Sequence, residues 1–236
     1  MDTHAVNTDM PALSRLQQPA LLVGVIGLVA AGVGAFLNLD QFFRSWLIGF
    51  LFCLGLSLGS LALLMLQHMS GGQWGLVGRR VFEAASRNLP FVALLFVPIL
   101  FGLPRLYEWA RPEMVQADHI LQMKAPYLNV PFFIARAVLY FVIWIGMSWL
   151  LNGWSDAQDR GELALTPADS RRFRVVSAPG LIVYVVTLTF ASTDWVMSLD
   201  PHWFSTIFGF IFVAAQGLAA FALVIVVLSQ LTATEP

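Results

Sequence analysis

Residues 193–206 form a compact polar and aromatic segment between two long apolar stretches. Within it, Asp200 and His202 flank Pro201, and tryptophans stand on either side of them. A carboxylate beside an imidazole can accept a proton from a hydroxyl group near neutral pH. The same composition is typical of an aromatic belt at a headgroup interface, so the pair is interpreted either as a proton acceptor or as a structural anchor.

A second pair of charges is expected deeper in the apolar stretches. Arg136 lies about seven residues into one stretch and Asp194 about five residues before the end of the next, which places them roughly 10 Å and roughly 7–8 Å below the same membrane face. Because a lone charge in lipid is costly, we expect an ion pair if the two helices are neighbours. Such a pair either fixes helix register or takes part in handling protons or a polar headgroup.

His68 ends another apolar stretch and is followed closely by Gly71, Gly72 and Gly75. We interpret it as a histidine in the last turn of a helix next to a glycine cap, with a functional role as the alternative. Because His68 and His202 are expected at opposite membrane faces, they are not expected to ligate one b-type haem together.

Residues 78–87 alternate charged and apolar groups at helical spacing, which predicts a short helix lying on the membrane surface. Glu83 within this segment is a candidate carboxylate for proton entry. The alternative, which we favour, is a surface ion pair between Glu83 and one of its arginine neighbours, Arg79, Arg80 or Arg87.

The composition indicates an integral membrane protein. The chain is 58% apolar and 11% charged, with a mean hydropathy of +0.75, far from the values of a soluble domain. A net charge of -1 provides no basic stripe, so nucleic acid is not expected as a partner. Cys53 is the only cysteine, which excludes C-x-x-C-H haem attachment, iron–sulfur ligation and disulfides within the chain.

The apolar stretches predict an all-α, polytopic transmembrane helix bundle with about six spans, each near the roughly 20 residues that cross a bilayer. The expected spans are residues 19–37, 45–67, 88–104, 129–151, 178–199 and 203–231. They make up a transmembrane helical domain over 18–231, between a polar tail at 1–17 and a short tail at 232–236. Small residues at 55–60 in the second span and at Gly24, Gly27 and 32–34 in the first predict close helix packing.

The basic residues predict the orientation of the chain. More of them fall on the amino-terminal side of the expected spans than on the opposite side, at Arg15, Arg79, Arg80, Arg87, Arg160, Arg171, Arg172 and Arg174. The positive-inside rule therefore places the N-terminus in the cytoplasm, and the bend at 194–202 then faces outward.

Three stretches together resemble one family. They are residues 61–75, residues 124–133 and residues 194–207, of which the run from Asp194 to Trp203 is the most specific. The similarity covers roughly residues 40–225 and is to the F-type subunit, the second NrfD-like membrane subunit, of bacterial alternative complex III, a quinol:cytochrome c oxidoreductase. The resemblance implies part of an NrfD-like bundle, because members of that family have more spans than the six expected here.

The resemblance also implies a role and a set of partners. It implies a multi-pass subunit of the bacterial inner membrane, with no cofactor of its own, that contributes to quinol interaction or proton translocation and is not catalytic alone. The implied partners are a multihaem cytochrome c subunit, an iron–sulfur subunit, a sister NrfD-like subunit, quinone and membrane lipids, with haem c and iron–sulfur clusters held by those subunits. Asp194, Asp200, His202, Arg136, His68 and Glu83 become candidates for a proton route or a quinone pocket.

Two other functions remain open on the sequence. A purely structural scaffold would use the same polar groups only to lock helices and to dock the redox subunits. A secondary transporter would ordinarily have inverted repeats or paired broken helices around a midplane site, and neither pattern is visible here. The transporter is therefore the least favoured of the three.

Overall fold

The computed structural model describes residues 11–71, 74–162 and 167–232, and these are all-α. The long helices are α1 (Pro11–Leu37), α2 (Leu39–Ser70), α4 (Leu89–Phe101), α8 (Val130–Asp159), α9 (Pro167–Trp195) and α10 (Phe208–Thr232). The short ones are α3 (Arg79–Ser86), α5 (Leu103–Leu106), η1 (Glu108–Ala110), α6 (Pro112–Ala117), α7 (His119–Lys124) and η2 (Met197–Leu199).

In this part of the chain, six helical segments are long and apolar enough to cross a membrane. They are Gln18–Leu37, Leu39–Ser70, Arg79–Phe101, Val130–Asp159, Arg171–Leu199 and Phe208–Gln230. Each overlaps one expected span, so the number and order of the spans are confirmed. The protein is therefore a multi-pass, all-helical membrane protein by length and composition.

The expected span boundaries are less accurate. α8 continues to Asp159, beyond the apolar stretch, because its polar last turns bond to α3. α9 ends at Trp195 and α10 begins only at Phe208, since the residues between them form η2 and turns. Residues 1–10 and 233–236 of the expected tails lie outside the described residues, whereas Pro11 already begins α1.

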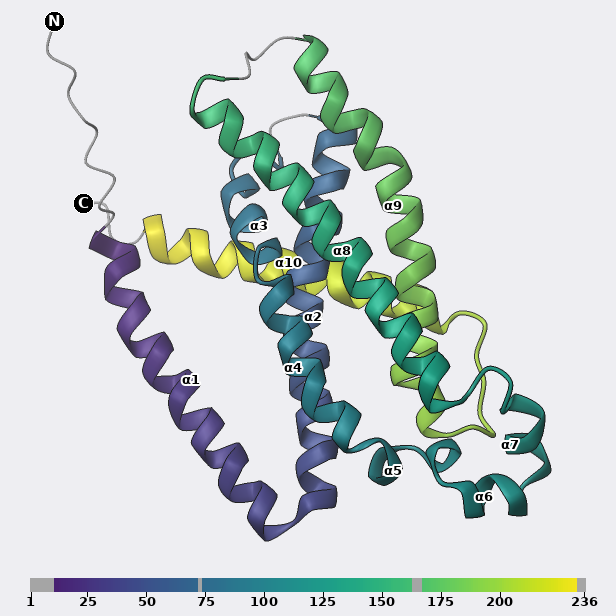
Figure 1. Cartoon of the computed structure of the whole chain (residues 1–236). Coiled ribbons are helices and arrows are strands. Elements are labelled where there is room, and N and C mark those ends of the chain that lie inside the picture. The colour runs from purple at the N-terminus through teal and green to yellow at the C-terminus, as the bar shows by residue number, and fades with distance from the viewer. Residues whose placement is uncertain (1–10, 72–73, 163–166, 233–236) are drawn as a thin grey trace, which may run out of the picture.

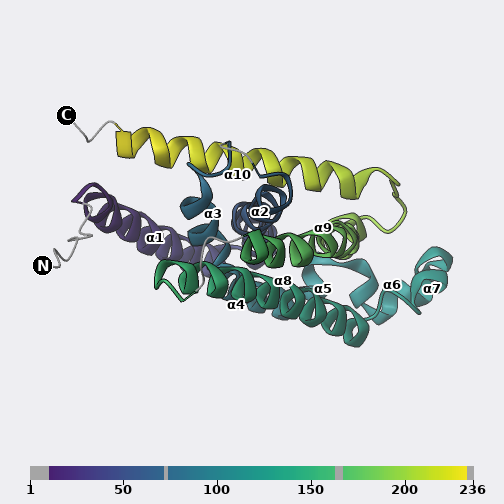
Figure 2. The same cartoon turned by 90° about the horizontal axis from the view of Figure 1, so that it is seen from above.

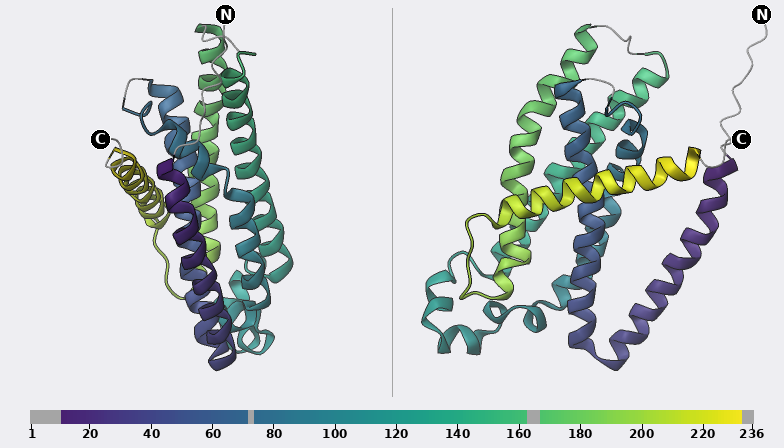
Figure 3. Two further views of the ribbon diagram at one scale, coloured as in Figure 1. Left: turned by 90° about the vertical axis from the view of Figure 1, so that its left-hand side faces the viewer. Right: turned by 180° about the vertical axis from the view of Figure 1, so that it is seen from behind.

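Helix α2 is the centre of the molecule (Figures 1 and 2). α4 and α9 run lengthwise beside it and α8 packs on both of them, while α10 crosses α2 at a steep angle, as Figure 3 shows. α1 leans away from α2 after the turn that joins them. The buried side chains of α2, including Leu54, Leu58 and Met65, supply much of the core.

An aromatic cluster fills the middle of the bundle around Trp195. The centroid of its ring lies between 4.9 and 6.0 Å from those of Phe50, Phe96, Tyr140, Phe141 and Trp144. Offset and edge-on aromatic contacts of this kind are favourable beyond the area that they bury. The cluster therefore fixes how α2, α4, α8 and α9 pack together.

The small residues of α2 allow α10 to cross closely. A Cβ atom added to Gly59 would lie 2.3 Å from the backbone oxygen of Gln216, so close packing is confirmed here. The same expectation for the first span is wrong in this structure. A Cβ atom at Gly24 or Gly27 would meet nothing within 4 Å, because α1 diverges from α2.

Gly59→Ala should destabilise the protein by about 1–3 kcal/mol, the usual cost of overpacking, because the neighbour of the new methyl group is backbone. Thermal unfolding of the purified protein in detergent, followed by circular dichroism, measures the change. Gly49→Ala is the matched control on the same helix, since nothing lies within 4 Å of its added Cβ. Equal stability of the two variants would contradict the assigned crossing of α2 and α10.

Candidate functional site

The polar residues of the bundle gather at its two ends. We call the end that carries α5–α7 and residues 196–207 the bend end, and the opposite end, with α3 and the last turns of α8, the α3 end. Arg136, Asp194, Asp200 and His202 lie at or near the bend end. Glu83 and His68 belong to the α3 end, so the structure divides the six candidate residues into separate groups.

Arg136 and Asp194 form a buried ion pair between α8 and α9. Asn129 caps α8 by accepting the backbone N–H of Phe132 at 3.0 Å, and this start places Arg136 within the second turn. Its Nε donates to Asp194 Oδ2 at 2.8 Å and its Nη2 to Oδ1 at 2.9 Å. Arg136 is 7% exposed and Asp194 is fully buried, which confirms the expected pair.

Two further groups complete this site. The Tyr140 hydroxyl donates to Asp194 Oδ2 at 2.8 Å, so Asp194 has three side-chain hydrogen bonds. The Arg136 guanidinium lies between the rings of Tyr127 and Phe132, 3.9 and 4.3 Å from their centroids, and also donates to the Tyr127 carbonyl at 3.0 Å. Both charges are thus compensated within the protein, as burial demands.

Tyr127 lies at the border between this ion pair and the bend end. Its hydroxyl oxygen is buried and has no hydrogen-bond partner among the described residues. Burial, followed by the negative charge of Asp194, raises the pKa of Tyr127 to about 12. The Tyr127 hydroxyl therefore stays protonated at neutral pH and is available as a donor.

A cavity of about 400 Å³ lies beside Tyr127 at the bend end. It separates the segment around α7 from the bend that follows α9, and its wall combines apolar and aromatic side chains with a few polar ones. The lining residues are Met123, Lys124, Tyr127, Leu128, Thr193, Met197, Ser198, Asp200, Pro201, Trp203 and Phe204. Because Tyr127 both lines this cavity and stacks on Arg136, a molecule in the cavity would be one side chain away from the buried pair.

Asp200 and His202 lie together at the surface of the bend end. Their closest side-chain atoms, His202 Nδ1 and Asp200 Oδ1, are 3.9 Å apart. The closer partner of His202 is one that the sequence did not indicate: Nε2 lies 2.7 Å from Asp118 Oδ2. The exposed pair and the buried pair are separate groups, with no hydrogen bond between them among the described residues.

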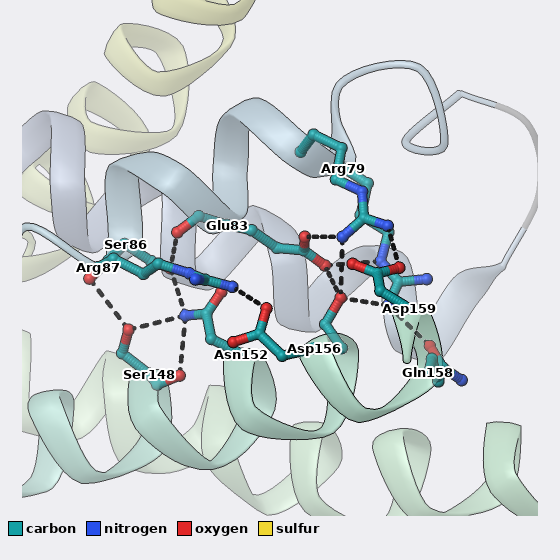
Figure 4. A network of polar contacts seen from close by, with 11 residues as sticks. Arg79, Glu83, Ser86, Arg87, Ser148, Asn152, Asp156, Gln158 and Asp159 are labelled. Carbon is teal, nitrogen blue, oxygen red and sulfur yellow. Dashed lines mark hydrogen bonds and ion pairs between the residues drawn. The ribbon is translucent and has the colours of Figure 1, made fainter. Parts of the chain in front are cut away.

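At the α3 end, Glu83 is only 2% exposed and is the centre of a polar network (Figure 4). Its Oε1 accepts from Arg79 Nε at 2.8 Å and from Ser155 Oγ at 2.6 Å, while Oε2 accepts from Arg80 Nη1 at 3.0 Å. The expected ion pair therefore forms with Arg79 and Arg80. This ion pair was expected at the surface, but Glu83 is buried because α8 packs over it and places Ser155 against its carboxylate.

The same network ties α3 further to α8 and corrects one other expectation. Arg87 pairs with Asp156 of α8 at 2.5 Å, and Arg80 also contacts Asp159. The short helix forms as α3, yet one of its faces packs into the bundle with Phe82 and Ser86 buried. α3 leads directly into α4 as part of one candidate span, so it is not a separate surface helix.

His68 occupies the last turn of α2, as the glycine pattern predicts. Gly71 caps the helix with a positive φ of 65° and donates its N–H to Gln67 O at 2.8 Å. The His68 ring packs on Phe173 with centroids 4.6 Å apart, and its Nε2 is buried without a hydrogen-bond partner in the described part of the chain. His68 thus lies at the opposite end from His202, as expected.

One face of α8 connects the two ends. Its buried hydrogen-bonding side chains recur every three or four residues, at Arg136, Tyr140, Trp144, Ser148, Asn152 and Ser155. At 1.5 Å per residue this face covers roughly 28 Å, close to the thickness of the hydrocarbon layer. We call it the α8 polar face.

Each middle member of the α8 polar face has a partner on another helix. Trp144 Nε1 donates to Thr187 Oγ1 at 2.9 Å, and Ser148 Oγ donates to the Ser86 carbonyl at 3.0 Å. Asn152 Nδ2 lies 3.0 Å from Ser86 Oγ. This face was not among the sequence-based predictions, although polar residues at four-residue spacing in an apolar span were a readable signal of it.

No protein-family model and no curated protein matches the chain. Among the described residues, no group of three or more His, Cys, Asp and Glu side chains could hold a metal ion. The candidate site consists of the buried Arg136–Asp194 ion pair beside a cavity, and the α8 polar face leads from this pair toward a second buried carboxylate, Glu83.

Replacing Arg136 by Gln or Asp194 by Asn alone should cost about 3–5 kcal/mol of stability, because each change leaves one buried charge without its partner. The double variant Arg136→Gln/Asp194→Asn should cost less than either single change. Thermal unfolding in detergent over this double-mutant cycle measures the coupling. The exposed pair Asp40–Arg105, at 2.6 Å, is the control, and its variants should change stability by no more than about 1 kcal/mol. Additive effects at Arg136 and Asp194 would contradict the pairing.

Proposed function

We propose that this chain is a cofactor-free membrane subunit of a respiratory quinol:cytochrome c oxidoreductase of the alternative complex III type. In this role it contributes to quinol interaction, to proton translocation, or to both. The observation that carries the proposal is the buried Arg136–Asp194 pair beside the cavity at the bend end. The resemblance of residues 194–207 to the F-type subunit supports it, because the same segment forms one wall of that cavity.

The cavity suits the headgroup of an amphipathic ring compound such as a quinol. Trp203, Phe204 and Tyr127 provide aromatic surface, and Lys124 and Asp200 provide polar contacts. Quinol oxidation releases protons together with electrons. Asp200 and His202 at the rim are exposed and can pass such protons to water, which is the role of a general base.

Asp194 is the proposed inner proton acceptor. Arg136 and Tyr140 both donate hydrogen bonds to its carboxylate. A proton would be held on Asp194 Oδ2 only when Arg136 moves away. The charge of Arg136 would then be compensated by its hydrogen bond to the Tyr127 carbonyl and by the rings of Tyr127 and Phe132. The pair would thus couple proton uptake to a change in side-chain position.

Glu83 is the corresponding proposed group at the α3 end. Ser155 and Arg79 bond to the same oxygen, Oε1, so a proton arriving there would also have to displace an arginine. The α8 polar face supplies hydrogen-bonding groups on the way between Glu83 and Asp194. His68 lies at this end as well, and its unpartnered Nε2 makes it a second candidate for proton entry.

The electrons would be carried by other subunits. The proposed partners are a multihaem cytochrome c subunit, an iron–sulfur subunit and a sister NrfD-like subunit, with membrane lipids and quinone. We place the chain in the bacterial inner membrane with its N-terminus in the cytoplasm, on the distribution of arginines. The α3 end then faces the cytoplasm and the bend end faces outward.

A structural scaffold is the second candidate function. The observation that favours it is that both buried carboxylates, Asp194 and Glu83, are already neutralised by arginines. Such pairs lock the packing of α8 on α9 and of α3 on α8. In that case the polar groups would hold the helices in place for the redox subunits.

Gentle detergent extraction of native membranes through an affinity tag on this chain, followed by mass spectrometry, tests the assignment. We expect co-purification of a multihaem cytochrome, an iron–sulfur protein and a second NrfD-like subunit in comparable amounts. The control is the same tag on an unrelated multi-pass protein. Recovery of this chain alone, or with partners that carry no redox groups, would contradict the respiratory assignment.

A further inference from the structure

Two contacts fasten the segment 118–128 to the bend after α9. His202 Nε2 lies 2.7 Å from Asp118 Oδ2, and Lys124 Nζ donates to the Pro201 carbonyl at 2.5 Å. The cavity of about 400 Å³ lies between the two segments. We call residues 118–128 the α7 lid, because α7 lies within them and they form one wall of that cavity.

The α7 lid is also attached to the body of the protein: the Tyr127 ring and carbonyl contact Arg136, and Gln122 donates to the Gln116 carbonyl. Leu121 and Leu128 are buried, while Gln122 and Met123 are exposed. α7 itself has only six residues, which is too short to be stable without tertiary contacts. Among the described residues, the two polar contacts are the hydrogen bonds and ion pairs that join the lid to the bend, so the position of α7 against the bend depends on them.

Only one of these contacts can change its charge state near neutral pH. A histidine gains or loses its charge between about pH 5 and about pH 8, whereas a lysine bound to a carbonyl remains charged there. The charged groups that face His202 are Asp118 from the lid and Asp200 from its own segment, with Lys124 bonded to the neighbouring residue.

Asp118 remains a carboxylate over this range. The backbone N–H groups of Ile120 and Leu121 donate to its Oδ1 at 2.7 and 3.4 Å, because Asp118 is also the N-cap of α7. The Ile120 bond above all, with the Leu121 and His202 contacts, holds the pKa of Asp118 below its usual value. Any pH dependence of this contact near neutrality therefore comes from His202.

We propose that the Asp118–His202 pair is a pH-sensitive latch that holds the α7 lid over the cavity. When His202 is protonated the contact is an ion pair and the lid is closed. As the pH rises the imidazole loses its charge, only a weaker hydrogen bond remains, and the lid opens more often. The latch would work in this way whatever molecule the cavity binds, so it goes beyond the proposed function.

Distance measurements between two spin labels test the latch directly. The labels are placed at Gln122→Cys on the lid and Arg44→Cys on α2, in a Cys53→Ser background, with the whole chain in lipid nanodiscs. We expect the ratio of closed to open distances to fall roughly two- to fivefold between about pH 5.5 and about pH 8, the range that a partly exposed ion pair can produce. An unchanged distance distribution in this labelled protein would overturn the proposal.

Three variants identify the responsible groups. His202→Gln removes the titrating group, and Asp118→Asn removes the carboxylate while an asparagine still caps α7, so both should lose the pH response. His119→Gln is the matched control on the same helix and should keep it. A response that persists in His202→Gln, or one that is lost in His119→Gln, would show that another group controls the lid. The measurement needs no respiratory activity, so its failure is distinct from failure of the proposed function.

Discussion

The interaction on which the site depends is the ion pair between Arg136 and Asp194. Taking two charges out of water is expensive, and their attraction offsets that cost only when the geometry is good and the remaining hydrogen-bonding positions are filled. Here the bidentate contact, the Tyr140 hydroxyl and the two aromatic rings meet these conditions. The start of α8 at its Asn129 cap and the last turn of α9 have to be in register for the pair to form at all.

The α3 end follows the same rule with different residues. Glu83 is buried because Arg79, Arg80 and Ser155 surround it. Between the two ends, Trp144 interrupts the α8 polar face, since an indole N–H donates a hydrogen bond but has no acceptor to receive a proton. The aromatic cluster therefore divides the polar groups into two halves, and any proton that crosses between them needs water or a side-chain movement.

The number and order of the spans could be predicted from the sequence, because an apolar stretch of about 20 residues has few stable structures other than a transmembrane helix. The Arg136–Asp194 pair could be predicted as well, from two lone charges at matched depth in consecutive spans. What the sequence did not reveal depends on contacts between distant segments. Asp118 meets His202 across 84 positions only because α7 folds back to the bend, and Glu83 is buried only because α8 extends past its apolar stretch to cover it. The sequence of α1 likewise does not indicate that this helix diverges from α2, since its glycines have the spacing typical of a closely packed helix.

We propose that the Arg136–Asp194 pair handles protons and does not merely hold two helices together. The most direct test is quinol turnover and proton release by the intact complex that carries Arg136→Gln/Asp194→Asn, a double change that leaves no unpaired buried charge. The comparison is with Asp40→Asn/Arg105→Gln, which removes the same groups from an exposed pair. We expect the complex to assemble and its coupled turnover to fall about a hundredfold, the lower end of what a positioned proton-transfer group contributes, while the control variant is unaffected. Wild-type turnover and proton yield in the buried double variant would contradict the claim and assign the pair a purely structural role.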